Sequence, residues 1–184
     1  MSESKVPTHA AQTPLDDFSG CHRGIIRNFE SLQALAESYR SGEAPSKLKD
    51  SARHILNFFE DVVRVHHAEE EEELFTAVLQ NLEGEDEETA RRARQQIRRL
   101  VHEHRELEAL WASLEEGLRQ LARGREADFD ADAAERLAQK YLAHARFEEE
   151  EFLPLAARIL DKSALSALGL SLHLRHQEEF NPYI

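Results

Sequence analysis

Two segments of the chain, HHAEEEEELF (residues 66–75) and HARFEEEEFL (residues 144–153), share one pattern. Each begins with a histidine, has a glutamate four residues later, and reaches a pair of large apolar residues eight residues after the histidine. Residues four apart lie on one face of a helix, so the imidazole and the carboxylate of each segment lie about one turn apart. The repetition indicates two helices that present the same chemistry to a shared interior.

Apolar residues at helical spacing extend outward from both segments and fill two further stretches of the chain. Glycine-containing breaks separate these stretches at residues 41–46, 83–86 and 123–125. The pattern predicts four long helices, over residues 15–41, 47–82, 87–122 and 130–160. Pro154 should kink or interrupt the last of them, and a short fifth helix is expected from residue 163 to about residue 176.

Long helices joined by short loops favour one architecture. We expect an all-α fold, an antiparallel up-down-up-down four-helix bundle with a short extra C-terminal helix. Residues 1–14 are expected to form a flexible N-terminal arm, residues 15–161 the bundle, and residues 162–184 the short C-terminal helix and tail.

Composition narrows the functional classes. The chain has 184 residues, enough for one domain with a real core, and a net charge of -13, which disfavours nucleic acid as a partner and favours cations. No apolar run approaches the roughly 18 residues of a membrane span, and the N-terminus lacks a secretion signal. The single cysteine, Cys21, excludes an internal disulfide. We therefore expect a cytoplasmic protein without a membrane partner.

The first and third helices each add a histidine to the apolar side. His22 lies between Phe18 and Ile25, and His104 lies between Leu100 and Leu107. Each half of the chain thus supplies a histidine on one helix and a His-x-x-x-Glu pair on the next.

Burying these groups singly would be costly, because an uncompensated carboxylate in a core neutralises or destabilises the fold. Cations offset the charges and accept the nitrogen lone pairs, and two glutamates can bridge two ions while histidines complete each end. Imidazole and carboxylate without thiolate suit iron, manganese or zinc. The candidate metal ligands are His22, His66, Glu70, His104, His144 and Glu148.

Other polar residues near these positions are assigned to the surface. On an α-helical wheel His67 shares a face with Glu60, Arg64 and Glu71, so we expect it to face solvent and choose His66 as the ligand. His54 and His102 are likewise interpreted as surface or boundary residues. The remaining glutamates of the two acidic runs are expected to be solvated, although some could orient the ligand histidines. Tyr141, one turn before His144, is either a core residue or a hydrogen-bond donor to a bound ligand.

At these residues the chain resembles the hemerythrin-like, or HHE cation-binding, proteins, over roughly residues 15–160. The motifs that carry the resemblance are His22, His66-x-x-x-Glu70, Glu103-His104 and His144-x-x-x-Glu148. The resemblance implies an oxo- or hydroxo-bridged centre of two non-haem iron ions inside the bundle, with zinc or manganese as substitutes. Glu70 and Glu148 would bridge the ions, and the four histidines would be terminal ligands.

One departure from the family pattern concerns the third helix. Oxygen-carrying hemerythrins have two histidines four residues apart there, whereas Leu100 and Glu108 occupy those positions around His104. Either Glu108 substitutes as a carboxylate ligand, or one metal keeps an open or water-filled position.

The resemblance implies a protein that binds or senses oxygen, nitric oxide or a related small ligand, rather than a dedicated enzyme. Two alternatives remain at this point. The same centre could turn over peroxide or nitric oxide, or the chain could be a structural or partner-binding bundle with vestigial histidines.

Overall fold

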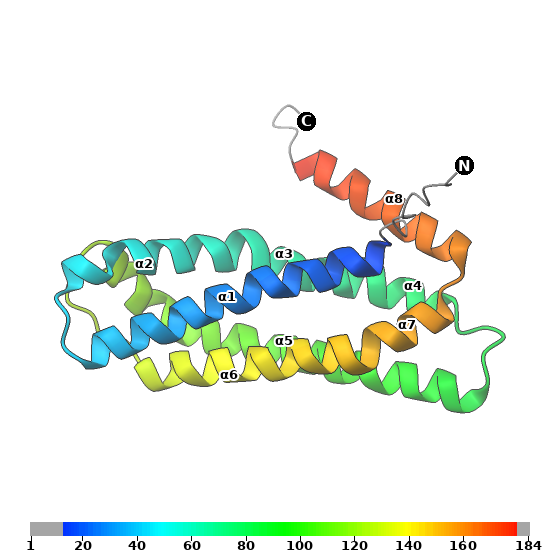
Figure 1. The fold of residues 1–184 in the computed structure, drawn as a ribbon, viewed down its shortest axis with the longest axis horizontal. Helices are drawn as coiled ribbons and strands as arrows, with labels where there is room; N and C mark the ends of the chain where they lie inside the picture. Colours follow the sequence, from blue (N-terminus) through cyan, green and yellow to red (C-terminus); the bar gives the residue numbers. More distant parts are fainter. Residues whose placement is uncertain (1–12, 180–184) are drawn as a thin grey trace, which may run out of the picture.

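The computed structural model describes residues 13–179, and the side chains of residues 13–174 (Figure 1). Nearly all of the predicted N-terminal arm, including His9, and the tail after residue 179 lie outside the described residues. Among the described residues every regular element is a helix, and none is long and apolar enough to cross a membrane.

The first helix, α1 (Pro14–Arg40), begins one residue before the expected position because Thr13 caps it. The Thr13 hydroxyl accepts a hydrogen bond from the Asp16 backbone N–H (3.3 Å), and the Asp16 carboxylate accepts one from the Thr13 N–H (2.7 Å). This reciprocal capping box satisfies two backbone donors at the helix start. Gly42, which comes shortly after the helix, has a φ of 79°, a conformation that glycine adopts at no steric cost.

The second and fourth predicted helices are each interrupted by π-helical turns. The second comprises α2 (Pro45–Phe58), η1 (Phe59–Val63), α3 (Arg64–Glu69), η2 (Glu70–Leu74) and α4 (Phe75–Gln80). The fourth comprises α6 (Ala131–Phe147), η3 (Glu148–Phe152) and α7 (Leu153–Ile159). The predicted interruption near Pro154 is present, but it takes the form of η3, and the proline lies in the first turn of α7. The third helix, α5 (Glu87–Ala122), is uninterrupted.

The helices form the predicted bundle (Figure 1). Helix α1 packs against α2 and α6, and α5 packs against the same two helices from the opposite corner. The fifth helix, α8 (Lys162–Glu179), is longer than expected and packs against α1 and η2 at one end of the bundle. The fold class is therefore the all-α four-helix bundle that the sequence predicts.

Two apolar clusters fill the bundle, one toward each end. The first contains stacked aromatic pairs, Phe59 on Trp111 (ring centroids 3.9 Å apart) and Phe29 on Tyr141 (4.4 Å). The second lies under α8 and the α4–α5 connection. We call the four long helical segments of the bundle its rods: α1, the segment from α2 to α4, α5, and the segment from α6 to α7. Along every rod, the polar residues singled out from the sequence lie between the two clusters. We call this band of buried histidines and glutamates the polar layer.

Candidate metal centre

The six side chains proposed as ligands from sequence are all buried and meet in the polar layer: His22, His66, Glu70, His104, His144 and Glu148. All four rods of the bundle contribute. The apolar stripe of each helix faces the core, and these polar residues lie within that stripe, so they face the core as well.

Glu70 is the centre of one half of the polar layer. Its carboxylate lies 2.9 Å from Nε2 of His66, 3.2 Å from Nε2 of His104 and 3.7 Å from Nε2 of His22. Three helices thus aim the same ring nitrogen at one buried carboxylate.

Glu148 holds the equivalent position in the other half. Its Oε2 atom lies 3.4 Å from Nε2 of His22 and 3.7 Å from Nε2 of His144. His22 therefore faces both carboxylates, which places the two halves of the polar layer against each other.

The expectation that His67 faces solvent is wrong. The residue is only 2% exposed, its ring stacks on that of His104 with centroids 4.0 Å apart, and the His144 ring is 5.8 Å away. The α-helical wheel failed here because π-helical turns lie directly before and directly after α3. Each such turn inserts a residue into the hydrogen-bond ladder and rotates the residues after it relative to an α-helix. His54 and His102 are exposed, as predicted.

Glu108 does not enter the polar layer. Its carboxylate is 32% exposed, pairs with Arg105 (3.1 Å) and lies 4.0 Å from the outer nitrogen Nδ1 of His67. A fifth buried imidazole, that of His67 on the second rod, is present in the layer, although the sequence had predicted only four.

Within the described residues, three groups bring ligand atoms within 4.8 Å of one another, close enough to share an ion. They are His67–His104–His144, His22–His66–Glu70, and Glu70–His144–Glu148. The first is made of imidazoles alone, and the two glutamates connect it to the second.

Glutamates one residue after each interior glutamate orient two of these rings. His22 Nδ1 lies 2.8 Å from Glu149, and His104 Nδ1 lies 2.8 Å from Glu71. An imidazole that donates Nδ1–H to a carboxylate presents its Nε2 lone pair on the opposite side, toward the layer. The acidic runs therefore include inward-reaching residues as well as solvated ones.

A third contact between a histidine Nδ1 and a carboxylate joins His144 of α6 to Glu103 of α5. His144 Nδ1 lies 3.0 Å from Glu103, whose other oxygen accepts from Arg99 at 2.7 Å. Because these contacts cross between helices, nothing in the spacing of a single helix reveals them.

The charges of the polar layer shift its pKa values. Burial lowers the pKa of His22, but close contacts with the Glu148 and Glu70 carboxylates outweigh burial and raise it to about 11. For Glu70 burial raises the pKa, yet the charge of His66 and contacts with the His104 and His22 rings bring it well below its usual value. Burial lowers the pKa of His67 to about 3. The layer thus holds negative charge that protons or cations must offset.

The atoms that face one another in the polar layer lack well-directed hydrogen-bond partners. Among the described residues these are Nε2 of all five buried histidines and both carboxylate oxygens of Glu70 and Glu148. Buried polar atoms are ordinarily paired, so such a concentration indicates a missing partner. Nitrogen and oxygen lone pairs without thiolate fit a divalent metal such as iron, manganese or zinc.

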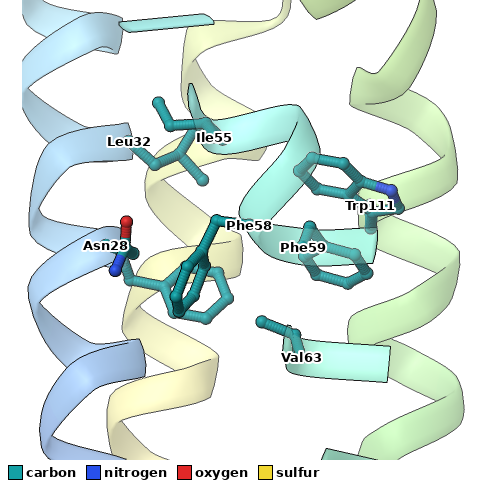
Figure 2. A pocket seen from close by; sticks show the side chains of 8 residues that line it. Asn28, Leu32, Ile55, Phe58, Phe59, Val63 and Trp111 are labelled. Atoms are coloured by element: carbon teal, nitrogen blue, oxygen red, sulfur yellow. The ribbon is translucent and has the colours of Figure 1, made fainter. Parts of the chain in front are cut away.

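Apolar side chains pack on both sides of the polar layer. The Tyr141 hydroxyl is buried without a hydrogen-bond partner, and Glu70 and Glu148 are near enough to raise the pKa of Tyr141 further after burial has done so. Figure 2 shows an apolar pocket beside η1, bounded by Phe58, Val63 and Trp111, among others. With about 10 Å³ of space it holds little more than one water molecule.

A four-helix bundle that buries histidines and glutamates from every rod in one layer defines a class of metal-binding proteins. The comparison with protein families narrows that class: the hemerythrin HHE cation binding domain matches residues 13–156, and the chain belongs to this family. An uncharacterized protein of Haemophilus influenzae is 23% identical over 164 residues, which cover 89% of this chain and 90% of that protein. No solved structure matches the chain.

Proposed function

We propose that the protein holds two iron ions in the polar layer and uses them to bind or sense oxygen, nitric oxide or a related small ligand. The observation that carries the proposal is the convergence of five imidazole Nε2 atoms and two carboxylates that have no well-directed hydrogen-bond partner. Iron is preferred over zinc or manganese because the resemblance to hemerythrin-like proteins implies it, and the ligand types suit all three.

The ligands divide unevenly between the two ions. His67, His104 and His144 form a group of three imidazoles, whereas His22 and His66 supply only two to the other side. Glu70 and Glu148 lie between the groups and serve as bridges. The side with fewer imidazoles has room for an external ligand, which matches the open position that the departure from the family pattern left as one alternative.

The protein residues around the centre determine what can reach it. The apolar clusters on both sides exclude bulk water, which favours small neutral ligands over solvated anions. The Tyr141 hydroxyl, a buried donor without a partner, is available to hydrogen-bond a ligand in the layer. When bound, the iron ions supply the redox-active, coordinating chemistry that the side chains lack.

Metal analysis and optical spectroscopy of anaerobically purified protein test the proposal. We expect two iron ions per chain, and an ultraviolet-visible spectrum that changes reversibly when oxygen or nitric oxide is added and removed. Glu148→Ala should lose both ions, because this carboxylate lies between the two groups, while His102→Ala on the exposed side of α5 should keep them.

Two results would overturn this function. Full stability without stoichiometric metal would identify a structural bundle with vestigial histidines. Consumption of peroxide or nitric oxide in proportion to iron content, in place of reversible binding, would identify an enzyme at the same centre.

A further inference from the structure

The two halves of the polar layer differ at the Nδ1 atom of one histidine, which is His144 in one half and His66 in the other. His144 Nδ1 lies 3.0 Å from Glu103, the residue directly before the layer histidine of α5. His66 occupies the corresponding place in the first half, and the residue directly before the layer histidine of α1 is Cys21. His66 Nδ1 is buried and has no hydrogen-bond partner among the described residues.

A groove opens on the side of the bundle where that carboxylate is missing. It has a volume of about 430 Å³ and lies between α1, α3 and α8, with Cys21, Phe18 and Glu69 among its lining residues. The Phe18 ring lies 6.0 Å from the His66 ring. Glu69 directly precedes Glu70, so the groove reaches from the surface to the residues beside the polar layer.

The equivalent face of the other half has a smaller groove, of about 260 Å³, which is lined by Arg92, Arg99 and Phe147. Arg99 donates to Glu103 at 2.7 Å and lies over the Phe147 ring at 3.6 Å. Phe147 stands three residues after His144, the place that Glu69 takes three residues after His66. The smaller groove therefore has arginines and an aromatic ring in its lining, whereas the larger one has carboxylates.

We propose that the two metal ions differ in lability, and that the ion held at His22 and His66 enters and leaves through the groove beneath α8. This inference rests on the proposed two-metal function. Three of the layer histidines are held by a carboxylate at Nδ1, which orients the ring and makes it a stronger ligand. Among the described residues, His66 and His67 both lack a hydrogen-bond partner at Nδ1. The ion at His22 and His66 therefore has one supported ring, whereas the ion at His67, His104 and His144 has two, so the first ion is held more weakly.

The charges that line the two grooves indicate which groove a metal ion passes through. Acidic side chains, Asp17 and Glu69, line the larger groove, whereas basic ones, Arg92 and Arg99, line the smaller one, so an approaching cation is favoured at the larger groove. The negative charge beside the groove also lowers the cost of partly dehydrating an ion before it reaches Glu70. Exchange of the ion at His67, His104 and His144 requires the loss of three imidazole ligands, two of them held at Nδ1 by a carboxylate.

The test is a time course of metal release from protein loaded with two Fe²⁺ ions, mixed anaerobically with excess of a chromogenic ferrous chelator. We expect two phases of one ion each. Cys21→Glu restores the carboxylate present in the other half and should slow the fast phase about 10–100-fold, the usual effect of such a partner on affinity. Cys21→Ala is the matched control and should leave both phases unchanged. Glu103→Ala should convert the slow ion into a faster one.

The outcomes separate this inference from the function on which it rests. If the protein binds two ions but releases them in a single phase, or if Cys21→Glu leaves a fast phase unaltered in a folded variant, the lability difference is refuted while the two-metal centre stands. If fewer than two ions bind to the wild-type protein, the proposed centre fails and the inference with it. The wild-type time course alone can decide, so the test does not depend on any variant folding.

Discussion

Replacing His67 with alanine tests whether the second rod supplies ligands to both ions. The change removes one of the three imidazoles in the group His67–His104–His144 and leaves His22, His66 and Glu70 untouched. We expect bound iron to fall from two ions per chain toward one, because the ion at this group loses one of its three imidazole ligands and the remaining two rings are positioned for a three-imidazole group. Metal analysis after gel filtration measures the stoichiometry directly.

The effect on stability should depend on the metal. In the apo protein, both ring nitrogens of His67 are buried without partners, each at a cost of about 1–3 kcal/mol, and their removal offsets the cavity that alanine leaves. The apo variant should therefore unfold at nearly the same denaturant concentration as the apo wild type. With iron present at about 100 times its dissociation constant, loss of one ion removes about 2.7 kcal/mol. The difference between the two proteins should thus appear only when metal is present.

His102→Ala is the matched control, because His102 lies on α5 with 76% of its side chain exposed. It should keep two ions and the stability of the wild type in both states. If His67→Ala still binds two ions, or if His102→Ala loses iron equally, the assignment of His67 to the three-imidazole group is refuted.

Three further predictions address the surroundings of the centre. Glu71→Gln weakens the carboxylate behind His104 and should reduce metal affinity about 10–100-fold in a chelator competition titration; unchanged affinity would show that the 2.8 Å contact does not support the ring. Tyr141→Phe removes a buried hydroxyl without a partner, so urea denaturation of the apo protein should show equal or higher stability, and a clear loss would reveal a hidden partner. The folded pKa of His22, about 11, exceeds its ordinary value of about 6.5. Its contribution to apo stability is therefore full below about pH 6.5 and lost as the pH rises toward 11, so the apo melting temperature should fall above neutral pH, and a rise would contradict this sign.

The fold was predictable because it depends on local periodicity. Apolar stripes and glycine-containing breaks placed four helices correctly, and the first of them ends at Arg40, one residue from the expected position. The π-helical turns were not predictable, because their extra residue leaves the sequence pattern looking α-helical. This holds for both turns that begin at an interior glutamate, Glu70 and Glu148.

The site was predictable only to the extent that one helix face determines it. Residues on apolar faces, such as His22 and His104, were found buried together, although their role as ligands remains a prediction. His67 was missed because its orientation depends on irregular turns. The sequence allowed that some glutamates orient ligand histidines, but it did not show which carboxylate contacts which ring, such as Glu149 and His22, because the contact joins residues distant in the sequence. Such partners require the packing of whole helices to be known.

The two halves of the chain can be compared residue by residue. Features that both halves share are those that the proposed metal centre requires, and features that differ would distinguish its two ions. Both halves keep the interior glutamate, which the proposed two-metal centre would need on each side. They differ where His67 in the first half corresponds to Ala145 in the second, and where Cys21 corresponds to Glu103. Both differences have the same effect. They would strengthen the ligand set at His67, His104 and His144 relative to the ligand set at His22 and His66. In the proposed centre this inequality would leave an open position for an external ligand on the side with fewer imidazoles. The same scaffold with equal halves would bind two ions well but would offer a small ligand no preferred side.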